Sequence, residues 1–158
     1  MHNTKIDISA ETRGKLTEIL NQRLADVSDL KSQAKQAHWN VKGMNFIALH
    51  ELFDQVATET DGYTDLIAER ITTLGGTALG TVRLAAERSS LAEYPHEITD
   101  GRDHVDALSN ALADFGKKVR ANIDDSDDLG DKDTADILTE ISRGIDKLLW
   151  FVEAHIQA

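Results

Sequence analysis

One stretch, residues 46–74, restricts the possible folds of this chain more than any other. It contains no Pro and a single Gly, so it predicts one continuous helix of about eight turns. At about 100° per residue, its large apolar residues fall in one stripe that would face the core of a helical bundle. The residues of this stripe are Leu49, Phe53, Val56, Ile67, Ile71 and Leu74.

Two pairs of candidate metal ligands lie on another side of the same helix. His50 and Asp54 are four residues apart, and so are Asp65 and Glu69, so the members of each pair are neighbours on the helix surface. Both pairs point away from the apolar stripe, which argues against a metal site buried inside one bundle. Asp54 and Asp65 are also about 16 Å apart along a straight helix, too far to share a metal.

The two pairs are symmetric about a point between Glu59 and Thr60. A second copy of the helix, laid antiparallel around a two-fold axis near this point, would set His50 against the other chain's Glu69. The two aspartates would face each other in the same way, and the symmetric contact would create two such sites. The spacing therefore predicts a metal site shared across a dimer interface.

Small residues near the expected crossing, Ala57 and Gly62, would let the two backbones approach closely. The alternative interpretation is an ordinary exposed helical face, which is usually rich in Asp and Glu. That interpretation accounts for any one of the four residues alone, but it does not account for two pairs placed symmetrically about one point.

Length and composition set further bounds. A chain of 158 residues predicts one domain over residues 1–158, with residues 1–10 as a short polar N-terminal arm. There is no Cys, which excludes disulfides and thiolate metal sites. The net charge of −11 favours attraction of cations and opposes general affinity for nucleic acid. No apolar run is long enough to span a bilayer and no signal-peptide core is present, so we expect a soluble, cytoplasmic protein without membrane contact.

The rest of the chain predicts an all-α fold, a four-helix bundle with a short extra helix in a long crossover between its second and third helices. The long helices are expected at about 10–41, 46–74, 100–122 and 134–154, and the short one at 82–89. A crossover of this length, residues 77–99, suits parallel neighbours in an up-down-down-up bundle.

The break at residues 42–45 predicts a hairpin that folds His38 back beside His50. Imidazole and carboxylate ligands without sulfur suit Fe(II), Mn(II) or Zn(II), and carboxylates stabilise Fe(III), so the set favours iron oxidation. Trp39, next to His38, could donate an electron or intercept a radical, although packing at the interface would also explain it.

An acidic segment, residues 124–133, lies between the last two helices. Taken alone it is interpreted as a solvated loop, with Asp133 and Thr134 capping the helix that follows. It lacks the ligand spacing of an EF-hand.

Several motifs together resemble one family. They are Lys35-Gln36-Ala37-His38-Trp39-Asn40-Val41-Lys42-Gly43, then Leu49-His50-Glu51-Leu52-Phe53-Asp54, then Asp65-x-x-Ala68-Glu69-Arg70-x-x-x-Leu74-Gly75-Gly76, and Asp133–Leu138 and Leu149–Phe151 near the C-terminus. They are similar to motifs of the Dps proteins, the miniferritins named as DNA-binding proteins from starved cells, over essentially the whole chain.

The resemblance implies a ferritin-like four-helix bundle assembled into a hollow dodecamer. Its members act as ferroxidases: they oxidise Fe(II), preferentially with hydrogen peroxide, and store ferric mineral inside, which protects the cell and its DNA. The family's ferroxidase centre matches His38, His50 and Asp54 of one chain with Asp65 and Glu69 of another. Zn or Mn could substitute for iron at such a site.

The resemblance also implies that the acidic segment lines an iron-entry pore at a three-fold axis, with Asp128, Asp133 and Asp136 as candidates.

Members of the family that condense DNA often use a Lys-rich tail, and the first twelve residues here hold one Lys against Asp7 and Glu11. We therefore expect weak or no DNA binding. A nucleoid protein that coats DNA, and a Zn or Mn protein without turnover, are the alternatives.

Overall fold

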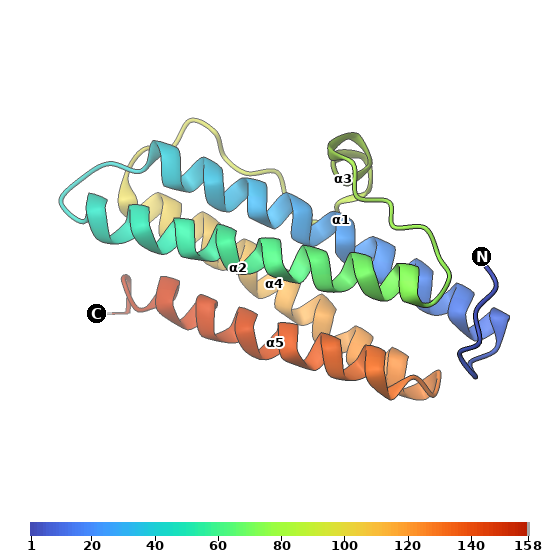
Figure 1. Ribbon diagram of the computed structural model, residues 1–158. Helices are drawn as coiled ribbons and strands as arrows, with labels where there is room; N and C mark the ends of the chain where they lie inside the picture. Colours follow the sequence, from blue (N-terminus) through green and yellow to red (C-terminus); the bar gives the residue numbers. More distant parts are fainter. Residues whose placement is uncertain (158) are drawn as a thin grey trace.

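The computed structural model describes residues 1–157 and is almost entirely helical. Its helices are α1 (Ala10–Asn40), α2 (Phe46–Thr73), α3 (Val82–Arg88), α4 (Gly101–Asp128) and α5 (Lys132–Glu153). The four long helices form a bundle in which α2 and α4 run in one direction and α1 and α5 in the other (Figure 1). This confirms the all-α, up-down-down-up bundle predicted from the sequence. Within residues 1–157, no helix is both long enough and apolar enough to cross a membrane.

A short hairpin loop sets α1 and α2 side by side. Gly43 in this loop has a φ of +110°, a conformation that glycine adopts more easily than other residues. The predicted apolar stripe of α2 is confirmed, because none of its members is more than 3% exposed. The side of α2 that carries His50, Asp54, Asp65 and Glu69 consequently lies outside the core.

One expectation about the crossing point on α2 is wrong. Ala57 is only 3% exposed and packs inside the subunit's own core, so it does not face a second copy. The reason is that the apolar face of a core-facing helix is wider than a single stripe, and here it extends to Ala57. Gly62 is exposed, with nothing within 4 Å of the position that a Cβ atom would take.

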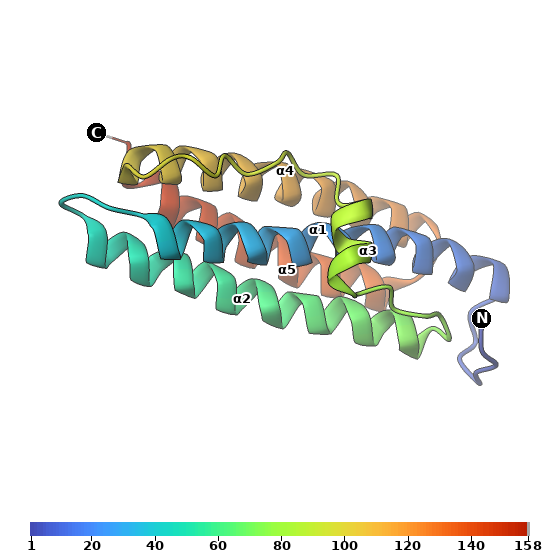
Figure 2. The same cartoon turned by 90° about the horizontal axis from the view of Figure 1, so that it is seen from above.

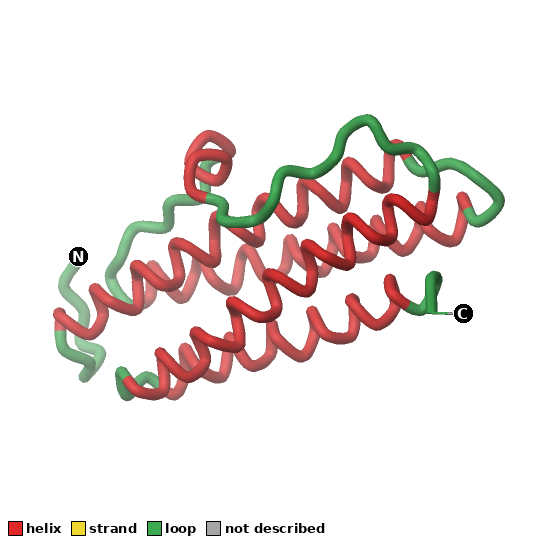
Figure 3. Tube along the Cα trace, turned by 180° about the vertical axis from the view of Figure 1, so that it is seen from behind, coloured by secondary structure: helices red, strands yellow, loops and turns green. Residues whose placement is uncertain are grey.

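The crossover from α2 to α4 follows the surface of the bundle and carries α3 across α1 (Figures 2 and 3). Polar side chains of α1 bind its backbone. Asn21 contacts both Thr77 O and Leu79 N, and Gln33 Nε2 donates to Ala92 O at 3.0 Å. This long connection is thus held in place because its backbone groups have side-chain partners.

The end of α4 differs from the prediction. The helix continues to Asp128 instead of ending near Asn122, so the segment predicted as a loop is mostly helical. Asp is a weak helix former, but Ser126 is fully buried on the bundle side of this last stretch, and tertiary packing outweighs the propensity. Gly130, with a φ of +81°, then ends the helix. The N-cap of α5 is Asp131, whose carboxylate accepts from Thr134 N, while Asp133 lies in the first turn.

The N-terminal arm is bound to the body of the protein. Arg13 is buried, and its Nη1 donates to Leu74 O at 2.7 Å while its Nε donates to Ile8 O at 3.1 Å. The backbone N–H of His2 donates to Gly75 O at 2.6 Å. The start of the arm is therefore bound to the turn that follows α2, and its end is bound to Arg13, which in turn binds Leu74 O.

Candidate metal centre

The α1–α2 hairpin brings two histidines into direct contact. His38 lies in the last turn of α1 and His50 in the second turn of α2, and their rings stack with centroids 3.7 Å apart. His38 Nδ1 lies 2.7 Å from His50 O, and His50 Nδ1 lies 2.8 Å from His38 O. Each ring is thus bound to the other residue's backbone.

These two contacts determine which ring nitrogen carries the proton. A carbonyl oxygen can only accept a hydrogen bond, so Nδ1 must be the donor in both rings. In the neutral imidazole, Nε2 then carries a free lone pair. Histidines that bind metals usually donate their other ring N–H to a carbonyl or carboxylate in this way, which fixes the ring's orientation. Both rings therefore have the arrangement expected of metal ligands.

Asp54 lies one turn of α2 beyond His50, and its carboxylate is half-exposed. The Lys35 ammonium contacts Asp54 Oδ1 at 2.6 Å. The pKa of Asp54 is lowered by the hydrogen bond from Lys35, which outweighs the opposing effect of desolvation, and the positive charge of Lys35 lowers it further. The carboxylate is thus held in its ionised form, the form that binds cations.

Asp65 and Glu69 lie further along α2 and are exposed to solvent. Neither makes an ion pair or a side-chain hydrogen bond within residues 1–157. One subunit does not bring them to the histidines, because 11 residues of straight helix separate Asp54 from Asp65, about 16 Å. In the described part of the chain, no group of three or more His, Asp or Glu residues could hold a metal ion. The two pairs of candidate ligands therefore stay apart within one subunit, and their union across a dimer interface stays a prediction.

Trp39 is exposed in the subunit, with 67% of its surface accessible. The Lys35 ammonium lies 5.7 Å from the centroid of its ring, within the range of a cation–π interaction. Trp39 adjoins His38 in sequence, and its role as an electron or radical relay stays a prediction.

The three pore candidates gather at one end of the bundle. Asp128 is the last residue of α4, and Asp133 and Asp136 occupy the first two turns of α5. All three are exposed. This end of the bundle is opposite to the α1–α2 hairpin that carries the two histidines (Figure 1).

The sequence analysis did not identify two cationic residues that bind carboxylates in and near the candidate sites. Lys35 binds Asp54, and the signal was available because Lys35 precedes His38 by three residues and so shares its side of α1. Arg70 follows Glu69, and its Nη2 donates to both carboxylate oxygens of Asp131 at 2.8 Å. This contact joins α2 to the start of α5, and nothing in the local sequence indicates it.

Comparison with known proteins places these features in a wider group. A Ferritin-like domain model matches residues 17–158. The chain is 47% identical to the DNA protection during starvation protein of Agrobacterium fabrum, over 99% of this chain and 96% of that protein. Among solved structures, a Mycobacterium smegmatis Dps has a TM-score of 0.94 at 30% identity, covering 99% of this chain and 96% of the other. Dps from Microbacterium arborescens, in a high-iron form, has a TM-score of 0.88 at 35% identity, covering 95% and 97%.

Proposed function

Since the chain belongs to the Dps family of ferritin-like proteins, we propose that it is a ferroxidase that oxidises Fe(II) with hydrogen peroxide and stores the ferric product. The observation that carries this proposal is the pair of reciprocal Nδ1 contacts between His38 and His50. They leave both Nε2 lone pairs free, and the ionised Asp54 lies one turn of α2 beyond His50. Two imidazole nitrogens and a carboxylate suit Fe(II), and added carboxylates favour Fe(III).

The remaining ligands, Asp65 and Glu69, come from a second copy of the chain. Both carboxylates are exposed and without an ion pair in the described subunit, so they are available to a partner. A two-fold axis near Glu59 and Thr60 would bring each half-site against the complementary half. The protein then works as a homo-oligomer, and its family indicates a dodecamer in the cytoplasm.

Exposed apolar side chains support assembly. Met44 and Ile47 of the hairpin are exposed, as is Trp150 near the end of α5. The α1–α2 hairpin and the C-terminal end of α5 lie at the same end of the bundle (Figure 1). Met and aromatic residues are enriched at protein–protein interfaces, so we assign these exposed side chains to subunit contacts.

The reaction consumes both reagents that generate hydroxyl radical. Hydrogen peroxide accepts one electron from each of two Fe(II) ions, its O–O bond breaks, and two protons complete two water molecules. The two Fe(III) ions move on to the mineral. His38, His50 and Asp54 would hold Fe(II) together with Asp65 and Glu69 of a second copy, and the carboxylates would stabilise the more highly charged product.

An anaerobic titration tests the proposal. Purified protein is titrated with Fe(II), and hydrogen peroxide is then added at half the iron concentration while ferric absorbance and particle size are followed. We expect rapid oxidation without release of iron from the particle. Prior saturation with Zn(II) should slow it if both metals share the site. Oxidation no faster than in buffer without protein would refute the ferroxidase and favour a Zn or Mn protein without turnover.

We propose that iron reaches the interior past Asp128, Asp133 and Asp136, because carboxylates replace the water that a cation loses in a narrow passage. Changing all three to Asn should slow uptake at low Fe(II), and more strongly at low salt, where screening is weak. Saturating Fe(II) should largely restore the rate. The control carries Asp7→Asn, Glu87→Gln and Glu97→Gln, three exposed changes of equal charge. Equal rates in both variants would contradict a local pore effect.

Coating of DNA, the alternative function, is disfavoured by the bound arm. The chain has a net charge of −11, and Arg13 is occupied by backbone carbonyls of the arm and of Leu74. An acidic surface repels the phosphate backbone. DNA protection would then follow from removal of Fe(II) and peroxide.

We predict no retardation of plasmid DNA in agarose gels at neutral pH and moderate salt. Chelator must be present, because divalent cations can bridge two anionic surfaces. As a control, the arm residues 1–8 are deleted, and this variant should also leave plasmid mobility unchanged. Strong retardation by the parent protein under these conditions would restore the DNA-coating function.

A further inference from the structure

The last part of the crossover, residues 93–98, has no helix or strand and is mostly exposed; we call it the strap. The carbonyl just before the strap accepts from Gln33 Nε2 at 3.0 Å, and the carbonyl just after it accepts from Lys42 N at 2.9 Å. Between these two points, Tyr94 is the one buried residue. Its hydroxyl makes the only hydrogen bond that joins the strap to the rest of residues 1–157.

The partner of Tyr94 is a buried histidine of α4. Tyr94 Oη lies 2.7 Å from Nδ1 of His104, which is only 1% exposed. The two rings are nearly parallel, and the ring of Phe53 on α2 lies 6.3 Å from that of His104. Nε2 of His104 makes no hydrogen bond within residues 1–157, although buried polar atoms normally have a partner. The histidine thus connects the strap to the core through one of its two nitrogens.

This environment suits the neutral ring and opposes the imidazolium. Burial lowers the pKa of His104, because a charged ring would lose its water there. Two nearby backbone groups and two carboxylates have weaker effects in the opposite direction; they belong to Ile98, Asn40, Asp103 and Asp100. The net result is a pKa below the ordinary value of a histidine.

The side chains that pack on His104 from other elements carry no charge. The ring of Phe53 comes from α2, and the strap contributes the phenol of Tyr94, whose pKa is raised by burial, so that it stays protonated. The end of α1 contributes only a backbone group, that of Asn40. His104 is therefore the one group in this contact that changes its charge at mildly acid pH.

Opening of the strap would give the imidazole its water back. In the open form the pKa of His104 would return to the ordinary value of about 6.5, so the open form binds the proton more readily than the closed form. Below about pH 6.5, each further pH unit therefore favours opening by up to about tenfold, until the pH reaches the lowered pKa of the closed form.

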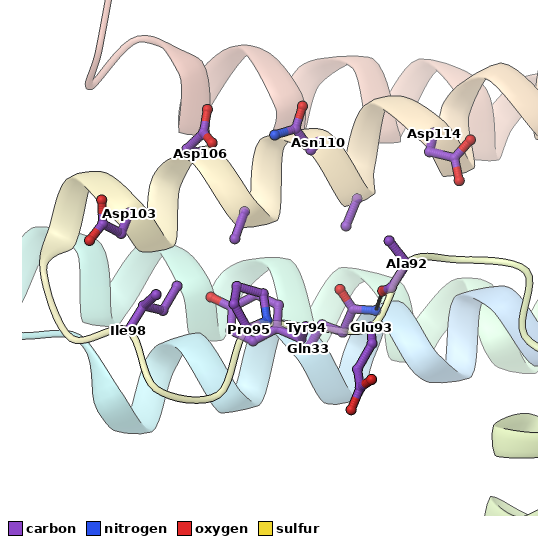
Figure 4. Close-up of a pocket in the computed structure, with 12 residues that line it drawn as sticks. Gln33, Ala92, Glu93, Tyr94, Pro95, Ile98, Asp103, Asp106, Asn110 and Asp114 are labelled. Atoms are coloured by element: carbon purple, nitrogen blue, oxygen red, sulfur yellow. Dashed lines mark hydrogen bonds between the residues drawn. The ribbon is translucent and has the colours of Figure 1, made fainter.

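We propose that the contact between Tyr94 and His104 is an acid-sensitive latch, and that protonation of His104 releases the strap from the bundle. A cavity of about 600 Å³ between the strap, α1 and α4 leaves room for this motion (Figure 4). Tyr94, Pro95 and Ile98 of the strap all line it, so one side of the strap is not packed against the core. The latch does not depend on the proposed iron chemistry.

Amide hydrogen exchange of the assembled protein, followed by mass spectrometry, tests the latch. After correction for the intrinsic exchange rate, opening of the strap should increase by up to about tenfold between about pH 6.5 and about pH 5.5. His104→Gln should remove this dependence, because an amide takes up no proton in this range but can still bind Tyr94 Oη. The matched control is His96→Gln in the strap itself, which should keep the dependence because His96 is exposed.

A second variant keeps the test open if His104→Gln does not fold. Tyr94→Phe retains the ring but loses the hydroxyl, so it should open the strap by about fivefold more than the parent at neutral pH. Exchange in residues 105–119 of α4 should stay slow throughout, which separates local opening from unfolding or dissociation. The same pH dependence in the parent and in His104→Gln would overturn the proposal. So would unchanged strap exchange in Tyr94→Phe, or an equal loss of protection in α4.

Discussion

Replacement of His50 by Ala is expected to slow peroxide-driven Fe(II) oxidation by about a hundredfold, because loss of groups that only orient metal ligands already costs 10- to 100-fold. The subunit should stay folded, since His50 points away from the apolar stripe of α2. His38 should also keep its orientation, because its Nδ1 is bound to the backbone oxygen of residue 50, which the substitution retains. Stopped-flow measurement of ferric absorbance gives the rate.

The matched control is His96→Ala. His96 lies exposed in the crossover, and its side chain makes no hydrogen bond in the described chain, so its loss should leave the rate unchanged. Asp54→Ala should slow the reaction as His50→Ala does. If both His50→Ala and Asp54→Ala oxidise Fe(II) at the parent rate, with particle size preserved, the metal centre is misassigned.

The sequence predicted the helix and the hairpin that carry His38, His50 and Asp54, but it did not predict the contacts that these side chains make. Residues 46–74 lack Pro and repeat their apolar residues at helical spacing, so local information alone determined the helix and its buried side. The hairpin also followed from the break at residues 42–45. The reciprocal contacts between His38 and His50 could not be predicted, because they depend on the loop conformation that Gly43 permits.

Errors in the prediction arose where distant packing outweighed local preference. Four Asp residues at 124–128 indicated a loop, yet burial of Ser126 against the bundle keeps this stretch helical. Ala57 was assigned to a subunit contact because it is small, but it fills the subunit's own core. Both errors concern residues whose environment is set by another helix, which a single sequence does not report.

Arg70 is likewise a residue whose environment is set by a distant element, because its partner Asp131 is 61 residues away.

Replacement of Arg70 by Ala is expected to lower the free energy of unfolding by about 3–5 kcal/mol, because it leaves a buried carboxylate unpaired. The Arg70 side chain is 10% exposed and that of Asp131 only 2%. Arg70 Nε also donates to Thr134 Oγ1 at 2.9 Å, a bond that would be lost too. Urea unfolding followed by circular dichroism, at equal protomer concentrations, measures the change.

The control is Arg120→Ala, which removes an ion pair with Asp146 in which both side chains are about half exposed. Its loss should cost less than about 1 kcal/mol. A similar cost for the two substitutions would show that the Arg70–Asp131 pair contributes no more than an ordinary surface contact.

The loss of stability at acid pH provides a second test of the ion pair between Arg70 and Asp131. Burial alone would raise the pKa of Asp131, but hydrogen bonds from Arg70 and Thr134, together with the charge of Arg70, lower it below its ordinary value. The folded state then binds this proton less readily than the unfolded chain. The contribution of Asp131 to stability is therefore fully present above about pH 4, the ordinary pKa of an Asp, and is lost as the pH falls through the lowered pKa.

Asp131→Asn removes the titrating group, so the stability of this variant should fall less steeply than that of the parent below about pH 4. Parallel curves for parent and variant in this range would mean that Asp131 titrates alike in the folded and unfolded chains, which is incompatible with a buried ion pair to Arg70.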